Sequence, residues 1–543
     1  MAVSDYLNIL LAFLIYRPLK RVVVGQVRMH HDWSDLFGKR LDNRLARLKR
    51  RFGSCWTLPG MLTLLSFAAC PWLHWSVIDP TETLRLVVGF AAVMLAWKSA
   101  TIDVDLAMGR HLIIERWVVL MAAMGVLFYP GFLFLLLFAA VHFLRAWQHH
   151  QHLQIRLALF FLATWIGYLI LSLVSAPSSM TVAGLFVTFV VTGSHYFVPG
   201  FAKLRLGPLW GAWIWRNRLN CLAMSAYMWG WCGFLPRARV ICWLRPLRYL
   251  NLPIQLMVII FELAAAALLF EPHGALAVLL LLAGFHLVVF ILGGILFWQN
   301  TVMLLSLGGI LVYLPEAITL RIFGSTQGIL AGLLMFILPV LRIWSPQKLA
   351  WWDTPLIART DWTVEGVSGK VYGLYNDFLE PNDRIFGNHS AYFLSQHKRL
   401  NRHLGQTSRW EIAEAIYDSL AAPERLEAVK AKLGQSAYDQ ELEFEHDRYM
   451  REFLTNFNLG RTKRICPRWL KAPGGQLFYW GRHPRFRGQE QVKRLTMRYR
   501  EEIFDGQQII TLRDDFLKEI EIPVEEIPVE EVPVEEVPAE PNR

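Results

Sequence analysis

Several polar residues lie in or beside long apolar segments of this 543-residue chain, where an ionisable side chain is costly. They are Lys203 just after the run Val182–Phe197, Glu262 inside Ile254–Phe270, His286 inside Ala275–Phe297, and the segment Trp147–His152 between two runs. Desolvation in a low-dielectric pocket disfavours the charged form of a lysine and makes its neutral amine available as a base. Lys203 is therefore a candidate for proton-transfer chemistry.

Each of these features also has a structural interpretation. Lys203 could be an anchor whose ammonium snorkels to the headgroup layer, and Glu262 could hydrogen-bond across helices. The histidines of Trp147–His152 could belong to a polar loop, since no carboxylate stands nearby to complete a metal site. No single one of these residues identifies a reaction.

The composition requires the first part of the chain to face lipid. Hydrophobic residues make up 54% of the sequence, charged residues make up 18%, and the mean hydropathy is +0.32. One soluble core cannot bury that much apolar surface. Apolar runs follow one another up to Ile343, whereas charged residues recur every few positions after Pro346. We expect an all-α polytopic membrane helix bundle with a C-terminal soluble, mainly helical domain and a disordered acidic Pro-rich tail.

Ten apolar runs are candidates for spans of the transmembrane bundle, which we assign to residues 57–345. The runs are Leu58–Trp75, Leu84–Trp97, Leu112–Tyr129, Phe132–Trp147, Leu157–Val174, Val182–Phe197, Ile254–Phe270, Ala275–Phe297, Val302–Leu314 and Ile329–Ile343. Several are shorter than the about 20 residues that a perpendicular helix needs, so we expect tilted or broken helices and about nine spans.

The segment 204–252 differs from its neighbours because Trp and Arg alternate along it. Tryptophan is enriched at membrane–water interfaces, and amphipathic helices with Lys or Arg on one face and Trp on the other lie in the headgroup layer. We therefore expect one or more interfacial helices here.

Basic residues predominate, since 55 Lys and Arg stand against 44 Asp and Glu, which gives a net charge of +11. They cluster beside apolar runs, most densely between Lys39 and Arg51, as the positive-inside rule describes. No aromatic or Gly-rich recognition motif accompanies the charge, so we expect membrane lipid and not nucleic acid as the partner. The N-terminal segment, residues 1–56, is placed in the cytoplasm.

The N-terminal apolar stretch Tyr6–Tyr16 is short and lacks a basic n-region and a cleavage site. We expect an interfacial segment or an uncleaved short anchor. The six cysteines form no C-x-x-C pair and no metal-ligand spacing with histidine. Neither structural disulfides nor a bound metal is therefore expected.

Residues 346–518 are predicted to form the soluble domain, with helical periodicity around Trp410–Leu433 and Tyr438–Phe457. A basic, aromatic segment at 461–487 could contact phosphate, a lipid headgroup or a protein, or could be solvated surface. Residues 519–543 carry Val-Glu-Glu-Ile/Val-Pro repeats, and the recurring prolines support neither helix nor sheet. We expect this tail to be disordered.

Taken in order, these residues resemble the HTTM (horizontally transferred transmembrane) domain, the family of vitamin K-dependent gamma-carboxylase. The resemblance covers residues 79–345, about half of the chain. It begins at Asp79-Pro80 and the Gly-containing helix that follows. The other segments that carry it are Trp147–Leu153, similar to the carboxylase stretch Trp-Asn-Asn-His-Ser-Tyr-Leu; Tyr196-Phe197, Gly200 and Lys203-Leu204 with Trp210 downstream; Glu262; and His286 with Gly293 and Phe297.

The resemblance implies that Lys203 is a catalytic base toward the acidic hydroxyl of a lipid-soluble, vitamin K-like quinol. His150 would take the place of the functional histidine and orient the lysine, so the two side chains should lie close together. The remaining members of the implied cofactor site are Tyr196, Gly200, Glu262 and His286.

The chain also departs from the carboxylase. Gln148 and His149 stand where the family has paired asparagines, and the part after Trp344 does not resemble the carboxylase lumenal domain. Carboxylation of protein glutamate is therefore not implied.

Two functions of different class remain open. One is an HTTM-type membrane enzyme with carboxylase-like chemistry that uses Lys203 and a quinol. The other is a non-catalytic anchor or scaffold that presents the C-terminal domain to a protein partner. A transporter is a weaker alternative, because no inverted repeat and few intramembrane charges are present.

Overall fold

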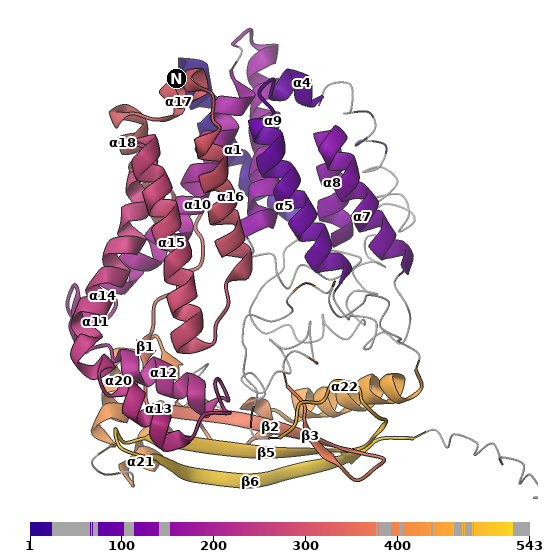
Figure 1. Cartoon of the computed structure of the whole chain (residues 1–543), viewed down its shortest axis with the longest axis vertical. Coiled ribbons are helices and arrows are strands. Elements are labelled where there is room, and N and C mark those ends of the chain that lie inside the picture. The colour runs from indigo at the N-terminus through magenta and orange to yellow at the C-terminus, as the bar shows by residue number, and fades with distance from the viewer. Residues whose placement is uncertain are drawn as a thin grey trace, which may run out of the picture.

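The computed structural model has a bundle of long helices with a β-sheet region at one end, and the N-terminus lies at the opposite end (Figure 1). The structure describes residues 1–23, 64, 66, 68, 74–101, 113–140, 153–176, 178–375, 378, 392–400, 405–420, 422, 424–435, 438–460, 470, 472, 481 and 483–524, without the side chains of Val22 and Glu445. The basic cluster from Lys39 to Arg51, the segment 461–469 and the tail beyond Val524 lie outside these residues.

The helices of the bundle come from the first two thirds of the chain. They are α1 (Val3–Val23), α4 (Trp75–Ile78), α5 (Thr83–Ala100), α7 (Ile113–Phe128), η2 (Pro130–Phe132), α8 (Leu133–Phe138), α9 (Leu153–Leu173), α10 (Met180–Leu204), α14 (Leu247–Ala264), η5 (Ala265–Ala267), α15 (Pro272–Gly293), α16 (Trp298–Val312), α17 (Glu316–Ile322) and α18 (Ser325–Val340).

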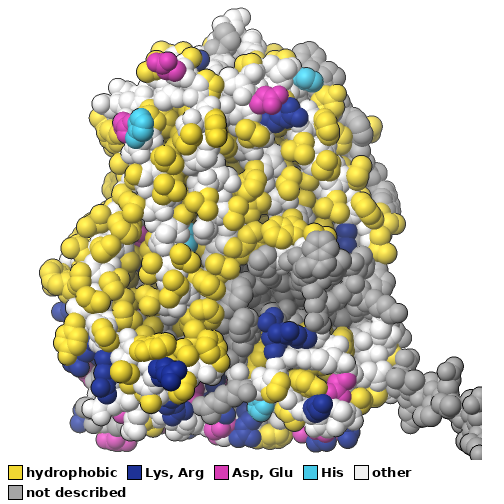
Figure 2. Space-filling model, viewed as in Figure 1, with side chains coloured by type: hydrophobic (Ala, Val, Ile, Leu, Met, Phe, Trp, Pro, Cys, Tyr) yellow, Lys and Arg dark blue, Asp and Glu magenta, His cyan; other side chains and the backbone are white. Residues whose placement is uncertain are grey.

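Five stretches of helix within the described residues are long and apolar enough to cross a membrane, as a multi-pass membrane protein requires. They are α5, α9, α10, the run Arg237–Ala267 that contains α14, and α15. A sixth is counted if α16 and α17, bent by 120°, form one broken span. Figure 2 shows hydrophobic side chains over the surface of the bundle and charged side chains gathered toward its two ends. Most of the predicted run Leu58–Trp75 and part of Phe132–Trp147 lie outside the described residues.

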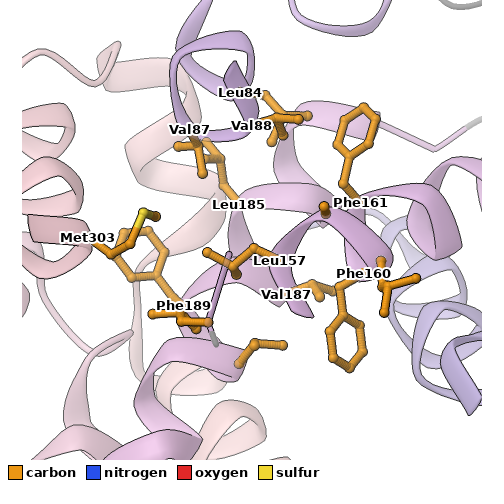
Figure 3. Packing of buried hydrophobic residues seen from close by; sticks show 14 of the residues in the cluster. Leu84, Val87, Val88, Leu157, Phe160, Phe161, Leu185, Val187, Phe189 and Met303 are labelled. Atoms are coloured by element: carbon orange, nitrogen blue, oxygen red, sulfur yellow. The ribbon is translucent and has the colours of Figure 1, made fainter. Parts of the chain in front are cut away.

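Helix α10 is the centre of the bundle. Its apolar window is 89% buried, against 22% for the Arg237–Ala267 run and 28% for α15, so those two helices keep most of their surface for lipid. Figure 3 shows the packing around it: Leu185, Val187 and Phe189 of α10, Leu157, Phe160 and Phe161 of α9, Leu84, Val87 and Val88 of α5, and Met303 of α16. Residues on α10 can therefore meet side chains from several helices.

Helix α1 is longer and more deeply placed than the sequence suggested. The predicted short anchor Tyr6–Tyr16 is part of a 21-residue helix, and Phe13 and Tyr16 are buried against Phe160 of α9. Asp5, fully buried, accepts hydrogen bonds from the Ser179 amide and the Arg321 guanidinium. The buried face of α1 therefore belongs to the core of the bundle.

The Trp- and Arg-rich segment forms three short helices before α14: α11 (Ala212–Arg216), α12 (Leu219–Met228) and α13 (Arg237–Leu244). Their buried side chains, including Met224 and Ile241, pack against Ile357 and Phe504 of the sheet. This segment therefore joins the membrane bundle to the C-terminal region.

The C-terminal region is built on strands, which corrects the prediction that the soluble domain is mainly helical. Its elements are β1 (Trp352–Asp353), β2 (Leu356–Gly366), β3 (Val371–Gly373), η6 (Tyr392–Leu394), β4 (Gln406–Thr407), α20 (Trp410–Asp418), α21 (Arg425–Leu433), α22 (Gln440–Asn458), β5 (Val492–Phe504) and β6 (Ile509–Glu521). The antiparallel sheet has the order β3-β2-β5-β6, and β1 pairs separately with β4. The predicted helices around Trp410–Leu433 and Tyr438–Phe457 are present as α20, α21 and α22.

Strands β5 and β6 were not predicted from the sequence because they contain many charged residues. In β5, Leu495, Met497 and Tyr499 are buried and alternate with more exposed polar residues, the period expected for a half-buried strand. Arg498 lies between them and is paired with Asp514 of β6. Strand β6 also continues to Glu521, past the boundary predicted at residue 518.

Candidate functional site

The ammonium of Lys203 is held by the carboxylate of Glu262. Lys203 lies in the last turn of α10 and Glu262 lies near the C-terminal end of α14, and Nζ is 2.5 Å from Oε1 and 2.7 Å from Oε2. The two side chains are only 10% and 5% exposed. Lys203 Nζ also lies 5.7 Å from the centre of the Trp213 ring. The lysine thus points into the protein. A snorkelling anchor would instead point toward the surface.

A glycine lets the two helices approach closely enough for this pair to form. A Cβ atom on Gly200 would lie 2.8 Å from the Cβ of Glu262, closer than real Cβ atoms approach. Gly200 stands one helical turn before Lys203, so the close approach and the ion pair share one face of α10. Gly200 therefore has a packing role at the site.

A second polar pair lies on the same face of α10. The hydroxyl of Tyr196 is 2.8 Å from Nε2 of His286 on α15, and both side chains are buried. Tyr196 precedes Gly200 by four positions and Lys203 by seven, which is the spacing of one helix face, and it is close enough to Glu262 to interact with its charge. The structure thus brings together Tyr196, Gly200, Lys203, Glu262 and His286, all of which were singled out in the sequence.

His286 retains an unused polar atom. Its Nδ1 is buried and has no hydrogen-bond partner among the described residues, and its ring lies 5.1 Å from that of Phe297. A buried polar atom without a partner is costly, and such atoms call for an explanation by a water, an ion or a ligand. The site therefore has capacity for one more hydroxyl or carbonyl group.

The C-terminal region contributes a carboxylate that was not predicted. Asp353 of β1 is 3% exposed, and its two side-chain oxygens accept hydrogen bonds from Asn217 Nδ2 (2.8 Å) and Trp351 Nε1 (3.2 Å). Burial raises the pKa of the Asp353 carboxyl to about 6, while these two donors and the charge of Lys203 act in the opposite direction. Asp353 is therefore a titratable group of the C-terminal region that interacts with the charge of Lys203.

Close contacts hold β1 against the end of α10 and against α11. Trp213 Nε1 donates a hydrogen bond to the backbone oxygen of Trp351 at 2.8 Å. Gly207 lies directly against Trp352, where a Cβ atom would be 2.8 Å from the indole ring. The signal for this contact in the sequence is Trp351-Trp352-Asp353, a dense aromatic and acidic group directly after the last apolar run.

Another polar pair lies on α9 and α10. Arg156 is 7% exposed, and its Nη1 lies 2.6 Å from Nε2 of His195, whose Nδ1 is 2.7 Å from the Val191 carbonyl. Arginine can only donate, so Nε2 of His195 accepts and Nδ1 carries the proton. Neither residue was predicted from the sequence to belong to a site.

The predicted partner His150 lies outside the described residues, as do Gln148 and His149, so its distance from Lys203 stays a prediction. Within the described parts of the chain, no group of three or more His, Cys, Asp and Glu side chains could hold a metal ion.

No family model, no curated protein and no solved structure matches this chain. The resemblance to the HTTM domain therefore rests on the residues of the chain alone.

Proposed function

We propose that this chain is a multi-pass membrane enzyme of the HTTM type, in which Lys203 and Glu262 exchange a proton with the acidic hydroxyl of a lipid-soluble quinol. The observation that carries the proposal is the buried Lys203–Glu262 pair, which lies on the face of α10 that also holds Tyr196.

The cost of the pair argues for a chemical role. Desolvating two charges consumes most of their mutual attraction, and replacing a buried ion pair by apolar side chains is often neutral or stabilising. Helices in a bilayer pack well through small residues, and Gly200 already provides such a contact between α10 and α14. Ionisable residues retained inside a membrane bundle in spite of this cost are typical of proton-transfer sites.

A proton can move between the two members of the pair without creating net charge. When the proton is on Lys203, the pair is an ammonium with a carboxylate; when it moves to Glu262, the pair is a neutral amine with a neutral acid. Both states are net neutral, so the low dielectric opposes the transfer only weakly. The amine form is a competent base for an acidic hydroxyl, and the ammonium form returns the proton.

The donors and acceptors around the pair fit a quinol. Nδ1 of His286 is free among the described residues to bond a ligand hydroxyl or carbonyl, and the Tyr196 hydroxyl fixes the orientation of the same imidazole. The Phe297 ring lies near His286, and the Trp213 ring lies near Lys203. Such rings suit a flat aromatic ligand. A bound quinol would supply an acidic hydroxyl and, once ionised, an electron-rich ring.

In the same proposal, Asp353 is the group through which the site exchanges protons with water. It is the buried carboxylate on the C-terminal side that interacts with Lys203, and with a pKa of about 6 it exchanges protons near neutral pH. Protons taken from a quinol could therefore leave toward the C-terminal region.

Binding of a naphthoquinone by the purified protein tests the proposal. The protein, in nanodiscs of neutral lipid, is titrated with a prenylated naphthoquinone, and quenching of tryptophan fluorescence is recorded. We expect saturable binding that Lys203→Ala and His286→Leu each weaken at least tenfold. Ser306→Ala is the matched control and should bind as the unchanged chain does, because α16 carries no member of the site and the Ser306 hydroxyl bonds only the Val302 carbonyl of its own helix among the contacts of the described residues.

Two outcomes would contradict the proposal. One is the absence of saturable binding by a folded protein, and the other is equal binding by all four proteins. Either result would favour the anchor or scaffold function, in which the Lys203–Glu262 pair only joins α10 to α14.

A further inference from the structure

Three arginines without a carboxylate partner among the described residues lie near the N-terminal end of the Arg237–Ala267 run. Arg239 of α13, Arg245, and Arg248 of α14 are exposed, and none contacts a carboxylate among the residues that the structure describes. The other arginines of this segment are engaged: Arg205 lies over Trp210, Arg216 over Trp410, Arg218 over Tyr417, and Arg237 donates to the Ile509 carbonyl. The three unpaired guanidinium groups therefore face outward with their hydrogen-bonding capacity free.

The sequence around them offers no compensating charge. Between Glu115 and Glu262 the chain contains no aspartate and no glutamate. The arginines of the sheet contrast with this pattern, because Arg494, Arg498 and Arg500 are each paired with carboxylates of neighbouring strands. The arginines on α13 and α14 thus form a local cationic surface.

The length of the helix places this surface at headgroup level. The run Arg237–Ala267 has 31 residues, about 46 Å at 1.5 Å per residue, whereas the hydrocarbon core is about 30 Å thick. About ten residues must therefore lie beyond the hydrocarbon. Exposed apolar side chains at Leu256, Met257 and Ile260 mark the part of the helix that faces acyl chains. The end that carries the arginines is therefore the part that lies beyond the hydrocarbon.

Aromatic side chains accompany the arginines. Trp243 is 59% exposed and Tyr249 is 84% exposed, and both stand among the three arginines in sequence. Such residues have an apolar ring and a polar tip, which suits the boundary between acyl chains and headgroups.

We propose that Arg239, Arg245 and Arg248, with Trp243 and Tyr249, form a binding surface for the phosphate groups of anionic phospholipids. The guanidinium fork bonds phosphate oxygens in pairs, and the attraction of each cation for an anionic leaflet adds to that of its neighbours. The surface lies on the segment that contacts both Ile357 of the sheet and Asn217, so a bound lipid would fix the joint between the bundle and the C-terminal region. This proposal is independent of the quinol chemistry.

The test measures lipid binding by the full chain in micelles of a neutral detergent. Fluorescent phosphatidylglycerol is titrated into the protein, with fluorescent phosphatidylcholine as the zwitterionic arm. The variant Arg239→Gln/Arg245→Gln/Arg248→Gln removes the cations, and Arg239→Lys/Arg245→Lys/Arg248→Lys keeps the charge. The matched control Arg425→Gln/Lys432→Gln/Arg451→Gln removes the same charge from exposed positions on α21 and α22.

We expect the unchanged chain and the control to bind phosphatidylglycerol alike and to prefer it over phosphatidylcholine. The glutamine variant should lose about a hundredfold in affinity, and the lysine variant, which keeps the charge but not the paired hydrogen bonds, should bind with an affinity between the two. Equal affinity of the glutamine variant and the unchanged chain would overturn the proposal, and so would an equal loss in the control. Should the glutamine variant fail to fold, loss of binding by the folded lysine variant to the level of phosphatidylcholine would likewise contradict it.

Discussion

Lys203 and Glu262, 59 positions apart in the sequence, form a bidentate ion pair between α10 and α14 in which the ammonium lies 2.5 and 2.7 Å from the two carboxylate oxygens. Both side chains are buried between the two helices, where neither group can reach water without leaving its place, so each is the natural partner of the other. This ion pair connects the fold with the proposed chemistry.

Removing one member of the pair should be more harmful than removing both. Lys203→Met leaves the Glu262 carboxylate buried without its cation, and we expect a loss of about 3–5 kcal/mol in the free energy of unfolding. Lys203→Met/Glu262→Leu should recover most of that loss. Denaturation in detergent, followed by circular dichroism, measures the full cycle.

The exposed pair Arg85–Glu82 is the control for this cycle, because its side chains are 33% and 67% exposed. Arg85→Gln should cost less than about 1 kcal/mol. A double variant as unstable as Lys203→Met alone would show that the pair contributes through something other than its charges.

Gly200 should tolerate no side chain. Gly200→Ala places a Cβ atom 2.8 Å from the Cβ of Glu262 and forces α10 and α14 apart, so we expect a loss of about 1–3 kcal/mol and weaker quinone binding. Gly284→Ala on α15 is the matched control, since nothing lies within 4 Å of a Cβ atom there. That change should be neutral or slightly stabilising. Equal stability of the two variants would exclude the close helix contact.

Asp353 should make stability depend on pH. Its folded pKa of about 6 lies above the ordinary value of 3.8 for an aspartate, so the folded protein holds this proton more tightly than the unfolded chain does. The stability contributed by proton binding is complete below about pH 4 and is lost as pH rises through about 6, with a total of about 3 kcal/mol. Asp353→Asn should remove this part of the pH dependence, as thermal unfolding at pH 5 and pH 7 would show. An unchanged gradient in the variant would assign the dependence to other groups.

Truncation of the C-terminus should show where the packed chain ends. Ile522 is buried, its amide donates to the Lys493 carbonyl, and the Pro523 carbonyl accepts from Asn458. Deleting residues 521–543 should therefore cost about 2 kcal/mol, whereas deleting 525–543 should be neutral because that acidic, Pro-rich composition supports no packed core. Thermal unfolding of the two deletion variants measures this difference. An equal effect of both deletions would show that the packed chain does not end between residues 521 and 525.

The sequence identified the members of the site better than their partners. Lys203, Glu262 and His286 stood out because ionisable residues are rare in or beside apolar runs, and Tyr196 was found through the resemblance. The pairing was not predicted, because the three helices α11, α12 and α13 separate the two runs and their path decides which faces meet. The predicted partner of Lys203 was His150, and that contact remains untested.

The features that were not predicted from the sequence lie mainly in the C-terminal region. Asp353 looked like an ordinary soluble carboxylate. The Trp351-Trp352-Asp353 group marks an aromatic, acidic segment, but it does not say that β1 docks on the end of α10 through Gly207 and Trp352. The sheet was missed because β5 and β6 carry charges that are neutralised by pairing across strands, as with Arg498 and Asp514. Long-range pairing of this kind is not a property of any short window.

The most direct test of the Lys203–Glu262 account is the ionisation of a bound naphthoquinol. The reduced quinol is bound to the protein in neutral nanodiscs without oxygen, and the absorbance of its anion is recorded from pH 6 to pH 10. If Lys203 and Glu262 accept its proton, the bound quinol should ionise at a lower pH in the unchanged chain than in Lys203→Met/Glu262→Leu, which has neither an amine nor a carboxylate to take up the proton. The same ionisation curve for both proteins, with the quinol bound in each, would contradict the account.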